Sequence, residues 1–320
     1  MLKFLSFHTL DKESMTDFKN KFSWSISQDR TFQTCKRKYY LNRYGSWGGW
    51  DKNSDELTRK IYILKNQATI PMLVGDVVHQ TISKILDSLK AGKTWDIGYS
   101  QKHAVRLFKD GWKQSKNEEW VQDPKRKKNL FEHYYDSTPS EEDLVEVGDS
   151  IKNTVENFYS SESFKFIKTS RPVDWLSKEE LGEFKVAGET VYCKIDFAVK
   201  HEDLVYLYDW KTGKKISEDE RQLAVYSLYA VNKWAVDLGD IRLFDVYLKT
   251  NTPLTIRASQ KLVEQTQQYI EKSIKEMKSL LDDPDENIAS IDNFPMIENK
   301  NFCKHCSFKE ICYPDSFRDL

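Results

Sequence analysis

Two aspartates and a lysine stand close together in the sequence, in an order that suits phosphate chemistry. Asp196 lies in the segment KIDF, and Asp209 precedes Lys211 by two residues in DWKTG. Two carboxylates can hold Mg²⁺ or Mn²⁺ through hard oxygen ligands and leave positions for water and a phosphate group. A lysine beside them can orient the attacking water or stabilise the charge that develops on phosphate. A lone D-x-K pattern, however, most often forms a solvated surface pair.

Three further polar residues accompany this group. His79 ends the segment GDVVH, and Gln222 and Tyr226 stand four residues apart in QLAVY. Side chains four residues apart share one face of a helix, so Gln222 and Tyr226 are expected to point the same way. By itself, a histidine beside an apolar stripe is more often a core residue than a ligand.

The elements that carry the aspartates read as a β-hairpin. Segments 189–200 and 204–211 are rich in β-branched and aromatic residues, and the polar turn 201–203 separates them. The pattern places Asp196 near the end of the first strand. Because side chains alternate along a strand, Asp209 and Lys211 are predicted to point to the same side of the second.

Helices are predicted around this hairpin. Apolar residues recur at helical spacing over 72–89, which includes His79. Ser217 and Glu220 form a capping box that predicts a helix over 221–236. A strand over 241–250 and a long helix over 258–281 follow. Ser25 or Ser27 is expected to cap a helix over 30–44 that carries Cys35.

In this order the motifs resemble the RecB-like branch of the PD-(D/E)XK nucleases. They are most similar to its iron-sulfur members, such as the CRISPR-associated adaptation exonuclease and the AddB nuclease domain. The resemblance implies an α/β fold with a restriction-endonuclease-like core, in which helices flank a mixed central β-sheet. We expect a single nuclease domain over 1–320, made of an N-terminal cluster helix and His-motif helix (24–80), a helical insertion (81–170), the catalytic sheet with the Q-x-x-x-Y helix (171–250), and a long helix with a C-terminal cysteine cluster loop (251–320).

The resemblance also implies roles for the residues of the motifs. The expected cation ligands are His79, Asp196, Asp209 and the backbone carbonyl of Trp210, and in this company His79 is better interpreted as a ligand than as a core residue. Lys211 would act on the attacking water. Gln222 and Tyr226 would help to hold the DNA backbone and the lysine.

Two positions depart from the family pattern or stay open. Cys193 stands where the family usually has glycine, and we interpret it as a buried strand residue. Glu179, Glu180 and Glu183 all precede the hairpin, and the sequence does not decide which of them, if any, enters the site.

Four cysteines form a second candidate site. Cys303, Cys306 and Cys312 lie in FCKHCSFKEIC, and Cys35 lies far away in the chain. Thiolates bind either Zn²⁺ or iron-sulfur clusters, and spacing alone does not separate the two. His305 offers a local zinc alternative. The resemblance favours a [4Fe-4S] cluster with a structural role, although the family usually has proline where this chain has Lys36.

Basic and aromatic residues near Cys35 are candidate contacts to DNA. A positively charged path with interleaved rings suits phosphate contacts and base stacking. The alternatives are a solvated charged face for the basic run 125–128 and a core position for the aromatic residues. The candidates are Lys36, Arg37, Lys38 and Arg43, with Tyr39, Tyr40, Trp47, Trp50 and the run Lys125, Arg126, Lys127 and Lys128.

Composition narrows the class of protein. The 320 residues include 49 Lys plus Arg against 50 Asp plus Glu, so any contact to nucleic acid must use local basic patches. No apolar run approaches the roughly 20 residues that span a bilayer, and the first residues lack a signal pattern, which predicts a cytoplasmic protein. No Walker A motif occurs, so the chain has no ATP-driven motor of its own.

The leading hypothesis is a Mg²⁺- or Mn²⁺-dependent deoxyribonuclease, an exonuclease or end-trimming enzyme. Its expected substrate is single-stranded DNA or frayed ends. One alternative is a catalytically silent DNA-binding scaffold that keeps the fold. Another is a nuclease subunit with protein partners in a recombination, CRISPR or defence complex.

Overall fold

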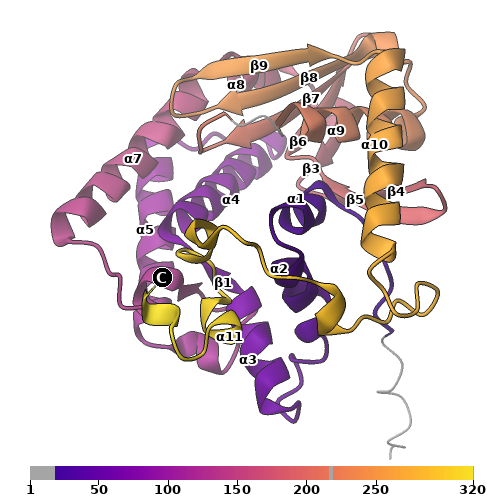
Figure 1. Cartoon of the computed structure of the whole chain (residues 1–320). Helices are drawn as coiled ribbons and strands as arrows, with labels where there is room; N and C mark the ends of the chain where they lie inside the picture. Colours follow the sequence, from indigo (N-terminus) through magenta and orange to yellow (C-terminus); the bar gives the residue numbers. More distant parts are fainter. Residues whose placement is uncertain (1–18, 216–218, 320) are drawn as a thin grey trace, which may run out of the picture.

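The computed structural model describes residues 19–215 and 219–319, which form a mixed α/β fold (Figure 1). Its central sheet has five strands in the order β3 (Trp175–Lys178), β6 (Phe197–His201), β7 (Leu204–Lys211), β8 (Ile241–Tyr247) and β9 (Thr252–Arg257). Only β7 and β8 run parallel, and the other neighbours are antiparallel. The sheet is therefore mixed, as predicted.

Helices cover both faces of this sheet. The β7–β8 crossover is α9 (Asp219–Trp234), which packs with α10 (Gln260–Lys278) on the face that carries Val205 and Leu207. The opposite face carries Tyr208 and Trp210 and packs against α4 (Ile70–Lys90) and α8 (Glu162–Thr169). Because neighbouring residues of β7 point to opposite faces, Asp209 and Lys211 share one side of the strand, as predicted, and this is the side that α9 covers.

The predicted first strand of the hairpin is two strands. β5 (Glu189–Lys194) pairs with β4 (Leu181–Val186) in a separate two-stranded sheet, and only β6 pairs with β7. The other edge of β5 is occupied by Trp24, which exchanges backbone hydrogen bonds of 2.8 Å with Thr190 and Tyr192. The continuous strand over 189–200 was therefore wrong, because its two halves pair with different partners.

The predicted helix over 30–44 is broken at Cys35. Helix α1 (Ile26–Thr34) ends and α2 (Lys36–Tyr40) begins at this residue, whose extended backbone has φ −156° and ψ 112°. A π-helical turn, Leu41–Gly45, follows. Ser25 caps α1 by accepting a hydrogen bond from the Gln28 N–H, so one of the two proposed caps is confirmed.

The other predicted helices are present, with shifted ends. α4 extends the predicted 72–89 by a few residues, and Thr69 caps it. α10 is shorter than the predicted 258–281, and α9 begins at Asp219. The predicted capping residue Ser217 lies outside the described residues.

The chain segment that follows α4 and precedes β3, residues 91–174, is also mostly helical. α5 (Ile97–Lys116) and α7 (Glu141–Ser160) pack beside α4, with the short α6 (Phe131–Tyr134) nearby. β1 (Gln67–Ala68) and β2 (Asn129–Leu130) form a small parallel pair next to α3 (Glu56–Lys65). The last short helix, α11 (Lys309–Cys312), lies near α3 and β1 in Figure 1. No helix in the described part of the chain has both the length and the apolarity to cross a membrane.

Candidate active site

Asp196 lies where the chain leaves β5 and enters β6. Its side chain is only 6% exposed, and Oδ2 accepts a 2.8 Å hydrogen bond from the backbone N–H of Trp210 on β7. This bond fixes the carboxylate against the neighbouring strand. The break between the two strands thus aims Asp196 at the end of the sheet that carries Asp209.

His79 projects from the middle of α4 toward two carboxylates. Its Nδ1 lies 3.4 Å from Asp196 Oδ1 and 3.5 Å from Glu179 Oε1. Glu179 follows β3 with a positive φ of 57°, and its N–H bonds to the carbonyl oxygen of Asp196. Of the three acids that the sequence left open, Glu179 is the one that reaches this group, whereas Glu180 and Glu183 are exposed.

Electrostatics make this group attractive to a cation. Burial lowers the pKa of His79, but Asp196 and Glu179 outweigh burial and raise it well above the usual value. Burial and the carboxylate of Asp209 raise the pKa of Asp196, against the influence of His79. Crowded, partly buried carboxylates are stabilised when a positive ion joins them.

The donor set fits a hard divalent cation. Ligand atoms of His79, Glu179 and Asp196 all lie within 4.8 Å of one another. Carboxylate oxygens suit Mg²⁺ and Mn²⁺, and imidazole is a common additional ligand of transition metals. Two of the predicted side-chain ligands, His79 and Asp196, are therefore brought together, and Glu179 joins them.

Asp209 faces a different set of partners. Its Oδ2 lies 2.7 Å from Lys211 Nζ, while Oδ1 accepts a 2.9 Å bond from Gln222 Nε2 and lies 2.7 Å from the Tyr226 hydroxyl. Lys211 Nζ also donates to Gln222 Oε1 at 2.7 Å. The four residues of D-x-K and Q-x-x-x-Y thus form one hydrogen-bonded network. Trp210, the remaining predicted ligand, lies between Asp209 and Lys211 and contacts Asp196 through its N–H.

Two further acids, which the sequence analysis missed, surround the lysine. Asp219 and Asp245 each place a carboxylate oxygen 3.9 Å from Lys211 Nζ. Asp219 also accepts a 2.6 Å hydrogen bond from the Tyr247 hydroxyl. Asp245 is fully buried, and neither of its carboxylate oxygens has a hydrogen-bond partner in the described structure.

One of these acids left a signal in the sequence. Asp245 shares the inward side of β8 with Ile241 and Leu243, both fully buried. A carboxylate at a core-facing position of an apolar strand is unusual unless it is paired or functional. Asp219 left no comparable signal, because only the fold brings the start of α9 to Lys211.

The four candidate cluster cysteines converge from the two ends of the described chain. Cys35 separates α1 from α2, Cys303 ends a 3₁₀ turn, and Cys312 ends α11. Burial and then the other three thiols raise the pKa of Cys312 to about 12, and burial likewise raises the pKa of Cys306. The thiols are thus close enough to influence one another. Cys35 lies at a break and not within a helix, which corrects its predicted setting.

The sulfur atoms do not form a compact group of three in the described part of the chain. Tetrahedral Zn²⁺ with Zn–S bonds of about 2.3 Å brings its sulfurs to roughly 3.8 Å from one another. Within the described residues, no three cysteine sulfurs, with or without His305, lie within 4.8 Å of one another. Cys193 is separate from them: it is buried on β5 in the main core, where burial raises its pKa to about 12.

Most candidate DNA contacts beside Cys35 have structural partners. Arg37 Nε donates to the Phe294 carbonyl at 2.7 Å, and Arg43 donates to the Lys21 carbonyl at 3.1 Å. Lys36 lies over the ring of Phe32. The backbone N–H of Lys38 donates to the sulfur of Cys35, a bond that does not involve the ammonium group of its side chain. Tyr39 and Tyr40 pack against Phe294, so for these two rings the structure agrees with the alternative of a core position. Trp47 and Trp50 are exposed.

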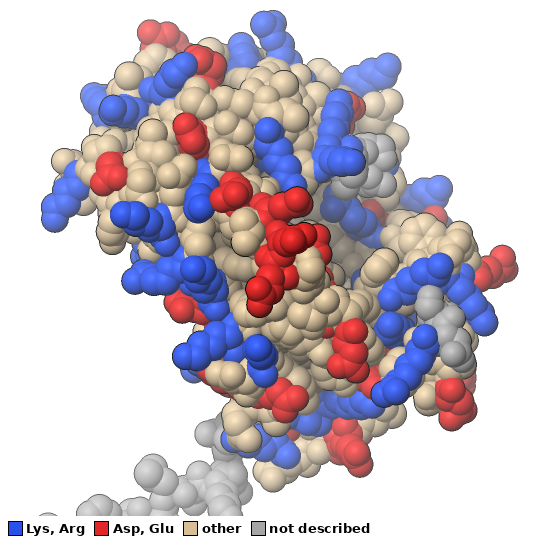
Figure 2. All heavy atoms as spheres, turned by 90° about the vertical axis from the view of Figure 1, so that its left-hand side faces the viewer, with Lys and Arg blue, Asp and Glu red and all other residues tan. Residues whose placement is uncertain are grey.

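The basic run 125–128 is partly neutralised. Lys127 pairs with Glu119 at 2.8 Å, and Lys128 pairs with Asp76 at 2.6 Å. On the side of the molecule nearest α7, basic side chains form several groups around a central acidic one (Figure 2). Positive charge is therefore local on this face, as the balanced composition predicts.

A hollow of about 400 Å³ opens directly beside the cation group. Its wall includes His79 and Glu179, together with Lys84 from α4 and Lys194 from the end of β5. Lys194 also forms an ion pair with Glu179. The candidate ligands are thus accessible from this side, although Asp196 and Asp209 are buried.

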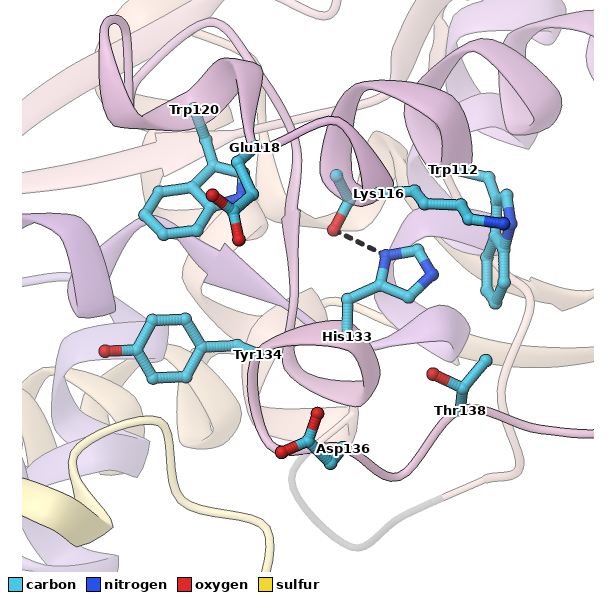
Figure 3. A pocket seen from close by; sticks show the side chains of 9 residues that line it. Trp112, Lys116, Glu118, Trp120, His133, Tyr134, Asp136 and Thr138 are labelled. Carbon is cyan, nitrogen blue, oxygen red and sulfur yellow. Dashed lines mark hydrogen bonds between the residues drawn. The ribbon is translucent and has the colours of Figure 1, made fainter.

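A larger hollow, of about 580 Å³, lies away from these residues (Figure 3). It is lined by Trp112, Trp120, His133 and Tyr134, and the ring of His133 hydrogen-bonds to Ser115 at 2.8 Å. None of the predicted site residues contributes to its wall. Size therefore does not identify the reactive centre in this molecule.

Comparison with known proteins gives one family match. Residues 23–313 match the model of a family described as the PD-(D/E)XK nuclease superfamily. No curated protein matches the chain. Among solved structures, a candidate exonuclease of Eubacterium rectale is similar, with 12% identity, 94% of each chain covered and a TM-score of 0.48.

Proposed function

The chain belongs to the PD-(D/E)XK nuclease superfamily, and from that premise we propose that it is a metal-dependent deoxyribonuclease of the RecB-like branch. The proposed substrate is DNA with single-stranded or frayed ends, cut as an exonuclease or end-trimming enzyme cuts it. One observation carries the metal dependence. The group of His79, Glu179 and Asp196 opens into a hollow and lies beside the Asp209–Lys211 pair.

The proposed cation ligands are His79, Asp196 and Asp209 with the Trp210 carbonyl, and Glu179 joins this set. A divalent cation bound there polarises the phosphate and lowers the pKa of a bound water. Asp196, held by the Trp210 N–H at 2.8 Å, keeps its other oxygen turned to His79. The protein thus supplies prearranged ligands, so little side-chain entropy is lost when the ion binds.

Lys211 is the proposed catalytic lysine. It keeps a charged ammonium group beside Asp209, where it can orient the attacking water and stabilise the charge that develops on the phosphate. Gln222 accepts a hydrogen bond from Lys211 and donates one to Asp209, so it fixes the relative position of the two. Tyr226 lies 2.7 Å from both Asp209 and the Lys194 carbonyl and holds this carboxylate against β5.

We also propose that Cys35, Cys303, Cys306 and Cys312 bind a [4Fe-4S] cluster with a structural role. The convergence of the two chain regions and the resemblance to the iron-sulfur members of the family support this assignment. The predicted division of 1–320 into one nuclease domain with a helical insertion belongs to the same proposal. The intact lysine network argues against a catalytically silent scaffold.

The test is cleavage of end-labelled DNA by protein that was purified without oxygen. We expect degradation with Mn²⁺ or Mg²⁺ and none with EDTA. Lys211→Ala should lower the rate by about 100- to 1,000-fold, because it removes a prearranged charge from the reacting phosphate. Lys200→Ala, which removes an exposed lysine from the adjacent strand β6, is the matched control and should cut normally. Full activity of Lys211→Ala would remove this mechanism.

A further inference from the structure

The hollow beside the candidate cation ligands has a second wall, which belongs to α5. His103 and Leu107 of this helix line the same hollow as His79 and Glu179. A smaller hollow of about 170 Å³ adjoins it, lined by Tyr99, Lys102, His103 and Arg106. His103 therefore lies where the two hollows meet.

The contact between Arg106 and His103 determines which ring nitrogen can donate. Arg106 Nη2 lies 3.1 Å from His103 Nδ1. A guanidinium group can only donate, so Nδ1 accepts, and the proton of the neutral ring lies on Nε2. Burial, together with the positive charges of Arg106 and Lys84, lowers the pKa of His103, which keeps the ring neutral. Nε2 has no hydrogen-bond partner among the described residues, so one donor is left for a ligand.

The ring of His103 is held in place by its neighbours. Trp95 meets it edge to face, with ring centroids 5.1 Å apart, and Tyr99 meets Trp95 in the same way at 4.7 Å. The Trp95 carbonyl accepts a 2.8 Å hydrogen bond from Tyr159 of α7. The donor is therefore prearranged, as a binding site requires.

The cations around the smaller hollow, and Lys84 of α4 near it, have few acidic partners. In the part of the chain that the structure describes, neither Arg106 nor Lys102 lies within 4.0 Å of a carboxylate, and Lys84 has only Asp87, at 3.7 Å. Other lysines nearby are paired, as Lys194 is with Glu179. The smaller hollow thus has a positively charged rim, and through His103 it adjoins the hollow at the cation ligands.

We propose that His103 and Arg106 form a subsite that binds a phosphate group of the substrate strand next to the scissile phosphate. This inference rests on the proposed function. A DNA strand that enters a site crowded with carboxylates is repelled by them, and cations in the adjoining hollow offset that repulsion. A guanidinium fork matches phosphate oxygens in geometry, and the imidazole N–H adds a third donor.

The test measures binding of a short fluorescein-labelled single-stranded oligonucleotide to the full chain in EDTA, where no cleavage occurs. Arg106→Gln should raise Kd about tenfold and reduce the slope of log Kd against log salt concentration by about one, because one phosphate contact is lost. Arg106→Lys, which keeps the charge, should restore the salt slope. Arg257→Gln is the matched control: it removes an exposed arginine at the opposite end of the sheet and should change neither value.

Oligonucleotides with and without a terminal phosphate identify the bound group. If the increase in Kd caused by Arg106→Gln disappears when the oligonucleotide lacks its terminal phosphate, the subsite binds the strand end. If the increase is unchanged, the subsite binds an internal phosphodiester. Wild-type Kd and salt slope in both Arg106→Gln and His103→Ala would overturn the subsite. This binding assay needs no catalysis, so it tests the subsite separately from the nuclease proposal. If the protein never cuts DNA but Arg106→Gln still weakens binding, the nuclease proposal is refuted and the phosphate subsite is supported.

Discussion

Lys211 holds its ammonium group among three carboxylates that come from three different elements. Asp209 of β7 is the nearest, at 2.7 Å, and Asp219 of α9 and Asp245 of β8 follow at 3.9 Å. The charge of these acids, that of Asp209 first, outweighs the burial of the lysine and raises its pKa, and Asp245 contributes this charge only where it is ionised. A lysine in this setting stays charged, so it acts as a fixed positive group and not as a base.

Asp245 gives a prediction at this scale. Burial raises its pKa to about 8, although Lys211 opposes this rise. An aspartate in the unfolded chain ionises near pH 4. Between roughly pH 4 and pH 8 the unfolded chain has therefore lost a proton that the folded chain keeps on Asp245. In this range the free energy of unfolding falls as pH rises. Asp245→Asn should therefore flatten this fall and stabilise the protein above pH 8, by at most about 5 kcal/mol.

Urea unfolding between pH 5 and pH 9 in EDTA measures this effect. Asp203→Asn, in the exposed turn between β6 and β7, is the control and should follow the wild-type curve. Parallel curves for Asp245→Asn and wild type would show that Asp245 is already ionised in the folded protein.

The motifs located most residues of the candidate site, and their limit is physical. Strand and helix periods predict that Asp209 and Lys211 share one side of a strand and that Gln222 and Tyr226 share one face of a helix. The family resemblance, and not local spacing, brought His79 and Asp196 to the same site. Three partners were not assigned from the sequence. Glu179 reaches the site because its backbone has a positive φ, and Asp219 because the crossover helix α9 begins beside Lys211. Asp245 reaches it because the β7–β8 register places it next to Asp209. Local spacing in the sequence determines none of these three features.

At the scale of elements, helices were easier to predict than strands. The helices over 72–89 and 258–281 have a clear apolar period, and both are present with shifted ends. The strands β3, β4 and β9 were not predicted, since β9 is an edge strand with little burial and β3 has only four residues. The prediction of one continuous strand over 189–200 was wrong because tertiary contacts decide which strands pair, and the sequence pattern does not show them.

Gly182 gives a prediction about how β4 meets α9. A Cβ atom built at Gly182 would lie 2.4 to 2.8 Å from the ring of Tyr229, closer than packed atoms approach. Gly182→Ala should therefore destabilise the protein by about 1–3 kcal/mol, because the strand or the ring has to move. Gly239→Ala is the matched control, since its Cβ meets nothing within 4 Å.

Chemical denaturation of both glycine variants checks this prediction. A wild-type unfolding midpoint for Gly182→Ala would mean that Tyr229 can swing away freely. Tyr229 is buried and packs against Trp234 with ring centroids 5.5 Å apart, which restricts such a movement.

At the scale of the whole molecule, segments from opposite ends of the described chain are joined. Asp29 of α1 accepts hydrogen bonds from Tyr269 at 2.7 Å and from Ser273 at 2.6 Å, both on α10. Trp24 donates to Ser273 at 2.9 Å. A second junction lies at the candidate cluster cysteines, where Leu41 and Phe308 share one apolar cluster and Cys306 and Cys312 pack against it.

Cys306→Ala tests the second junction. If a cluster binds there, its binding free energy contributes to folding, and loss of one ligand should give colourless protein with a clearly lower melting temperature. Cys193→Ala is the control, because this buried cysteine lies in the core and should leave the visible spectrum unchanged. Brown Cys306→Ala protein with wild-type iron content would contradict the assigned ligand set.

The hydrogen bond between Asp29 and Tyr269 also limits how early α1 can reach its native contacts during synthesis. The two residues are 240 positions apart, so at ribosomal speeds of about 5–20 residues per second Asp29 emerges roughly 12–48 s before its partner exists. During that interval α1 has no α10 to dock on, and its apolar side chains remain available to chaperones. Helix α1 of this nuclease is thus made well before α10, the helix that completes its native contacts.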